Sequence, residues 1–150
     1  MTYTRRFFGF CLAGFFVAFG WVAHATEPYE PARGSEERSA ILNSVRPKIE
    51  IEMRGPVEFV VSRLRVLDSW AFATLEPQRP DGIEIDVSKT AWADDVGFMD
   101  GLTVFALVRR TENGWFLIDS VTAPTDVAFL HWPKFYGAPR VIFDFPEQPE

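Results

Sequence analysis

Two segments of the chain are apolar at consecutive positions instead of alternating ones. Val104 to Val108 is apolar throughout, and Trp115 to Ile118 repeats this pattern after the turn sequence Asn113-Gly114. β-branched and aromatic residues favour strands, and Asn-Gly suits a two-residue turn, so the sequence predicts a hairpin here. Because adjacent strand residues point to opposite faces, we expect both strands to be central in a sheet that is covered on both sides.

A second hairpin is predicted upstream. The segments "VEFVVSRLRVL" and "WAFATLE" read as strands joined by a tight turn at Asp68-Ser69. Apolar residues fall at odd positions early in the first strand and at even positions later, and a strand of period two cannot keep both sets on one face. A bulge or sharp bend near Ser62-Arg63 would reconcile the two sets.

One helix is predicted before these strands. Ser35 suits the N-cap, and the apolar face comprises Ile41, Leu42, Val45 and Ile49. Pro47 leaves two alternatives. Either the helix kinks and runs to about Met53, which we favour, or it stops near Val45 and "IEIEM" forms a short strand.

One helix cannot cover both faces of a four-stranded sheet, so the second cover must come from the C-terminal segment, a bound molecule or another subunit. In "PTDVAFLHWPKFYGAP", Thr125 or Asp126 can cap a short helix that Pro133 interrupts, and "PRVIFDF" offers a returning edge strand. The predicted fold is therefore α+β. It has an N-terminal helix packed on a curved antiparallel sheet of four or five strands, with a short C-terminal helical segment.

The N-terminus has the pattern of an export signal. Arg5 and Arg6 precede an uncharged apolar run, and Ala23-His24-Ala25 is an A-x-A cleavage site, so cleavage is predicted after Ala25. The alternative is an uncleaved membrane anchor, and the export route is either Sec or twin-arginine. Residues 1–25 are thus expected to be a signal peptide, 26–34 a flexible lead-in and 35–150 a single domain of a periplasmic or secreted protein.

Cleavage of the signal peptide would remove several of the chemically reactive residues from the protein. Cys11 and His24 leave with it, so the mature chain has no cysteine and one histidine, His131. Disulfides, thiol catalysis and zinc sites built on cysteine or several histidines are excluded, and we expect no metal or cofactor. Of the 15 basic residues 13 remain with all 21 acidic ones, which gives a formal charge of −8 and argues against nucleic acid as a partner.

The order of elements resembles the cystatin-like and NTF2-like folds over Ser35–Phe145. The strands "SWAF" and "NGWFLIDS" look like those of small NTF2-like domains, and W-A-F, N-G-W and P-T-D-V resemble a pattern in small uncharacterised exported bacterial proteins. The NTF2-like resemblance implies either an enzyme with polar residues inside a cone, or a module that binds ligands or dimerises through its sheet. This chain has less helix before the sheet than larger members, so no deep cone is expected.

A long acidic loop is predicted between the hairpins, from Pro77 to Gly101, and it holds six carboxylates, the last of them that of Asp100. Its candidate partner-binding residues are Asp81, Glu84, Asp86, Trp92, Asp94 and Asp95. Loops of this length are often functional in compact domains. The spacing of the carboxylates matches no calcium-loop pattern, so a solvated acidic surface is favoured over a calcium site.

A second candidate site is made of basic and aromatic residues. The candidate ligand-binding residues are Arg63, Arg65, Arg109, Trp115 and Trp132. Arginines that share one strand face can hold a carboxylate or phosphate with paired hydrogen bonds. The alternative is a solvated outer face of the sheet.

Three classes of function are consistent with these features. The first is an exported non-catalytic module that binds an envelope protein or a small ligand through its curved sheet and acidic loop, with a homodimer through the sheet as a further mode. The second is an inhibitor or immunity-type protein of a cell-envelope enzyme. The third is a small hydrolase or isomerase that uses His131 with Asp119 or Asp126. On one helix, His131 and Asp126 would lie about 140° apart, so an aromatic-packed structural histidine is favoured.

Overall fold

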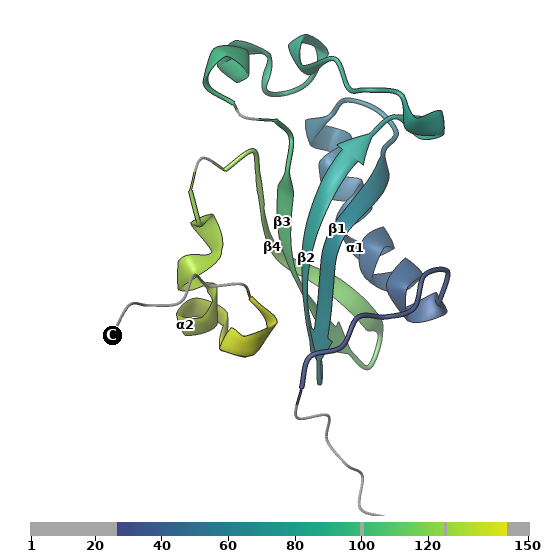
Figure 1. Cartoon of the computed structure of the whole chain (residues 1–150), viewed down its shortest axis with the longest axis vertical. Helices are drawn as coiled ribbons and strands as arrows, with labels where there is room; N and C mark the ends of the chain where they lie inside the picture. Colours follow the sequence, from purple (N-terminus) through teal and green to yellow (C-terminus); the bar gives the residue numbers. More distant parts are fainter. Residues whose placement is uncertain (1–26, 100, 125, 144–150) are drawn as a thin grey trace, which may run out of the picture.

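The sheet lies between a helix and the C-terminal segment (Figure 1). The computed structural model describes residues 27–99, 101–124 and 126–143. The helices and strands are α1 (Glu36–Glu52), β1 (Glu58–Leu67), β2 (Trp70–Gln78), β3 (Val104–Thr111), β4 (Gly114–Thr122) and α2 (Trp132–Tyr136). The four strands are antiparallel in the order β1-β2-β3-β4. The predicted α+β class is confirmed, with four strands among the described residues.

Helix α1 begins and ends where the favoured alternative places it. The hydroxyl of Ser35 accepts a hydrogen bond from the backbone N–H of Arg38 at 3.2 Å, which caps the first turn. The helix continues through Pro47 to Glu52, so the alternative of a strand over "IEIEM" is wrong.

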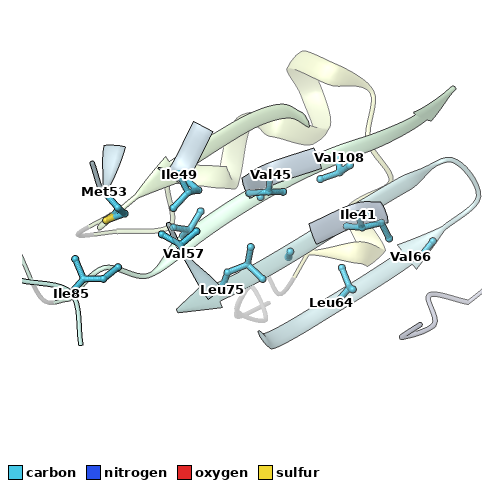
Figure 2. Packing of buried hydrophobic residues seen from close by; sticks show 14 residues of the cluster. Ile41, Val45, Ile49, Met53, Val57, Leu64, Val66, Leu75, Ile85 and Val108 are labelled. Atoms are coloured by element: carbon cyan, nitrogen blue, oxygen red, sulfur yellow. The ribbon is translucent and has the colours of Figure 1, made fainter. Parts of the chain in front are cut away.

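The first apolar cluster lies between α1 and the sheet. Figure 2 shows Ile41, Val45 and Ile49 pointing from the helix onto strand residues such as Leu75 and Val108. All five side chains are fully buried. This spacing along the helix places one apolar stripe against one face of the sheet.

The predicted bulge in β1 is present. The pairing with β2 shifts between Val61 and Arg63, which leaves Ser62 as the extra residue. The bulge keeps the apolar residues before and after it on the α1 face. Arg63 and Arg65 consequently point to the opposite face.

The second hairpin is confirmed, but its turn lies one residue earlier than predicted. Gly114 pairs with Thr111, so Glu112 and Asn113 form the tip. Only the glycine takes a positive φ, +116°, which a residue without a Cβ adopts at no steric cost.

The expectation that β4 is central is wrong. The strands follow one another in chain order, so the first and the last lie at the two edges. Phe116 and Ile118 of β4 are 46% and 38% exposed. A run of consecutive apolar residues therefore occurs in both kinds of strand: in β3, which is central, and in β4, which lies at an edge with one side exposed.

The C-terminal segment covers the second face of the sheet. It is one of the three alternatives that the sequence left open, beside a bound molecule and another subunit. Phe72 of β2 lies at the centre of this second cluster and is 1% exposed. Its ring centroid is 4.8 Å from that of Phe129 and 4.9 Å from that of Phe143. Trp132 is also buried in this cluster.

The local structure of this cover differs from the expectation. Pro133 does not interrupt a helix; it lies in the first turn of α2, where its missing N–H costs nothing. The preceding 3-10 turn, Ala128–His131, has no side-chain cap, and Thr125 lies outside the described residues. Arg140–Ile142 forms another 3-10 turn instead of an edge strand.

The lead-in before α1 makes specific contacts with the domain. Tyr29 and Val66 form an isolated antiparallel bridge, with N–O distances of 2.9 and 2.8 Å. The Tyr29 hydroxyl also donates to Glu37 at 3.0 Å, and Glu30 pairs with Arg38 at 2.8 Å. The bridge brings the lead-in against the outer edge of β1, and the other two contacts attach it to the first turn of α1.

Replacing Phe72 with alanine tests the second cluster. Phe72→Ala should lower the free energy of unfolding by about 3–5 kcal/mol, because it leaves a cavity among four aromatic side chains. Phe135→Ala is the matched control. Its side chain is 74% exposed, so the change should stay within about 0.5 kcal/mol. Equal effects of both substitutions in urea unfolding would contradict the described packing.

Candidate functional site

The candidate catalytic residues do not form an acid–base pair. His131 is exposed, and among the described residues its ring contacts only that of Phe135, at 6.1 Å in an edge-on arrangement. No hydrogen bond or ion pair joins it to Asp119 or Asp126 in the described part of the chain. Asp119 instead accepts a hydrogen bond from the Tyr136 hydroxyl at 2.8 Å, and this bond raises the pKa of Tyr136. The aromatic neighbours Phe129 and Trp132 form the wall of the core, whereas His131 faces away from it.

The five candidate ligand-binding residues lie in different surroundings. Trp132 is buried in the second cluster. Trp115 packs against the α1 cluster on the other face of the sheet. The guanidinium of Arg109 lies over the ring of Trp70 at 4.9 Å. The structure therefore does not bring these three residues into one pocket.

Arg63 and Arg65 do lie together. They line a hollow of about 340 Å³ with Ser62, Leu64 and residues 28–30, and we call this the lead-in hollow. The β1 bulge and the lead-in form its two sides. Sequence reasoning found the arginine pair but missed the lead-in, whose position depends on the Tyr29–Val66 bridge.

The acidic loop, residues 79–103, is attached to the core at several points. Ile85 is 4% exposed and lies at the Met53 end of the first cluster (Figure 2). The backbone N–H of Ala91 donates to the carbonyl of Glu52 at 2.8 Å, and Trp92 packs against the same cluster. Thr90 is fully buried. These anchors give the loop a defined conformation over the end of α1.

Arg79 links the start of the loop to the end of α1 by hydrogen bonds. Its guanidinium donates to the carbonyl of Met53 at 2.7 Å and to that of Pro56 at 3.1 Å. No local sequence pattern predicts that Ile85, Thr90 and Arg79 attach the loop to the core. Their roles depend on contacts with residues that lie far away along the chain.

The carboxylates of the loop point to solvent. Those described as exposed are Asp81, Glu84, Asp86, Asp94 and Asp95, and Asp100 lies outside the described residues. Asp86 accepts hydrogen bonds from the hydroxyl and the N–H of Ser88, and it pairs with Lys89 at 2.9 Å. The Ser88 hydrogen bond is the main cause that lowers the pKa of Asp86, with Lys89 next. Trp92, by contrast, belongs to the anchored side of the loop.

A second hollow, of about 320 Å³, lies between this loop and the end of β2. Pro77, Ile85, Val87 and Leu102 give it an apolar lining, and Glu76 and Glu84 supply carboxylates. We call it the loop hollow. An apolar lining beside carboxylates suits a long cationic side chain, whose aliphatic stem needs apolar contact and whose charge needs an acidic partner.

The described residues offer no metal centre. None of their histidine, cysteine, aspartate and glutamate side chains gather in a group of three or more that could hold an ion. Within the same part of the chain, no helix has both the length and the apolar composition needed to cross a bilayer.

Comparisons with protein-family models, with curated proteins and with solved structures give no match for this chain.

Proposed function

We propose that the protein is an exported, non-catalytic module that binds a positively charged protein surface through its acidic loop. The loop hollow carries this proposal, because it combines an apolar lining with two carboxylates. Glu84 is exposed, and the half-buried Glu76 also accepts a hydrogen bond from the Thr103 hydroxyl at 2.8 Å. A lysine or arginine side chain of a partner protein would fill it. The surrounding exposed carboxylates would favour approach of a basic surface.

Anchoring of the loop supports the proposal. A loop that is already ordered loses little conformational entropy on binding, so its contacts contribute more fully to affinity. The buried Ile85 and Thr90 fix the backbone on the inner side. On the outer side, Ile83 is 63% exposed and offers an apolar contact beside the carboxylates.

The exposed position of His131 favours binding over catalysis. A general base needs a substrate pocket and a partner that orients it, and His131 has only an aromatic contact among the described residues. The second class of function, an inhibitor or immunity-type protein, is a special case of the same proposal. In that case the basic surface belongs to a cell-envelope enzyme.

A peptide rich in lysine tests the proposal on the mature chain. In NMR titrations, the largest shift changes should fall on residues around the loop hollow. Glu84→Gln should weaken binding about two- to fivefold, the range expected for one partly exposed ion pair. Glu112→Gln is the control with the same charge change. It lies in the β3–β4 turn, at the opposite end of the sheet from the loop (Figure 1).

The proposal would be wrong if the two variants bound the peptide equally well, or if the shift changes were spread evenly over all acidic residues. Either result would mean that only the net negative charge attracts the peptide.

Export rests on the N-terminal pattern, which lies outside the described residues. When the full chain is expressed in a bacterium, the mature protein should be recovered outside the cytoplasm with Thr26 as its first residue. N-terminal sequencing checks this expectation. A chain that keeps residues 1–25 and sediments with membranes would support the uncleaved anchor instead.

A further inference from the structure

The outer edge of β1 presents backbone groups that no described residue pairs. Pro77 has no N–H, so its pair with Phe59 cannot be a hydrogen-bonded one. The N–H and C=O of Phe59 therefore point away from β2, and by alternation so do those of Val61. Further along β1, the corresponding groups of Val66 bond to Tyr29. The segment Glu58–Val61 is thus an open strand edge.

The other edge of the sheet is protected. Lys48 extends from α1 to β4, where its ammonium donates to the Ser120 hydroxyl at 2.6 Å and the Ser120 carbonyl at 3.3 Å. The pairing of β4 with β3 also shifts at Ile118, and a bulge of this kind disfavours pairing with another strand. Of the two edges, β1 offers the more regular hydrogen-bonding surface.

One hollow lies beside the open edge, and a second adjoins its Val61 end. The lead-in hollow lies beside Arg63 and Arg65, which point to the face opposite α1. A hollow of about 370 Å³ lies on the α1 side, between Phe59–Val61 and residues of the helix and its start that include Arg33 and Leu42; we call it the helix hollow. Successive side chains of an added strand point to opposite faces, so each hollow can receive one set of them.

Positive charge gathers at these hollows. Of the described residues that line them, Arg33, Arg38, Arg63 and Arg65 are basic and Glu30 alone is acidic, in a chain with a formal charge of −6. Glu30 pairs with Arg38. Arg33 and Arg65 contact no carboxylate within the described part of the chain. The edge therefore has two cations available, one at each hollow, against one carboxylate of its own, that of the exposed Glu58.

We propose that the β1 edge binds an extended acidic segment of a partner protein, which adds as a fifth strand over Glu58–Val61. Backbone hydrogen bonds to Phe59 and Val61 supply the pairing. Aspartate or glutamate side chains of the segment reach Arg33 on one face and Arg65 on the other.

Charge decides against a second copy of this chain as the occupant. Two β1 edges placed side by side would bring two sets of these arginines together, and like charges across a strand pair are destabilising. This binding site lies one strand away from the loop hollow, since Phe59 and Val60 pair with Pro77 and Glu76, and it requires a partner of the opposite charge. Its success or failure is therefore independent of the proposed function.

The test uses the mature chain and a synthetic peptide of about seven residues with alternating glutamate and valine. On binding, hydrogen exchange at the amides of Phe59 and Val61 should slow, because both become hydrogen-bonded. Arg65→Glu should weaken binding about tenfold or more. Lys134→Glu in α2 is the control with the same charge change, and it should alter affinity less than about twofold. Equal unfolding midpoints in urea confirm that both variants are folded.

N-methylated peptides separate strand addition from simple charge attraction. One peptide is methylated on every glutamate and another on every valine, so that each loses the N–H groups of one strand edge while keeping its charge. Loss of binding by at least one of them supports the proposal. Binding of both with unchanged affinity, no binding of the parent peptide, or unchanged exchange at Phe59 and Val61 would overturn it.

Discussion

Burial of both faces of the β2–β3 pair is the constraint on which the rest of the structure depends. Alternate residues of these strands face α1 or the C-terminal segment, and neither set is polar enough to face water. Phe72 is the centre of the second face, in contact with aromatic rings from β3 and from the C-terminal segment. The last part of the described chain is thus part of the core, although it contains little regular secondary structure.

Local patterns in the sequence predicted most of the fold. The capped helix, the two hairpins and the bulge at Ser62 each follow from residues that are close along the chain. The central position of β4 was mispredicted because an apolar run has the same appearance in a central strand and in an edge strand with exposed aromatic residues. Strand order depends on connections, which the apolar pattern does not contain.

The candidate sites were harder to predict than the fold, because they depend on contacts between residues that are far apart in the sequence. The pairing of Arg63 with Arg65 is local, since residues two apart on a strand share a face. The hollow beside them depends on Tyr29, which bonds to β1 across a distance in sequence that no motif marks. The acidic composition of the loop was visible, whereas its attachment through Ile85 and Arg79 depends on the end of α1.

The two proposed binding surfaces both depend on this core, because α1 anchors the acidic loop at one end and lines the helix hollow near the other. The most direct measurement of the core is a nuclear Overhauser spectrum of the mature chain. The account predicts cross-peaks from the Phe72 ring to the rings of Phe129 and Phe143, whose centroids lie 4.8 and 4.9 Å away. A Phe72 ring with cross-peaks to neighbouring strands alone would show that the C-terminal segment does not cover the sheet, and would contradict the account.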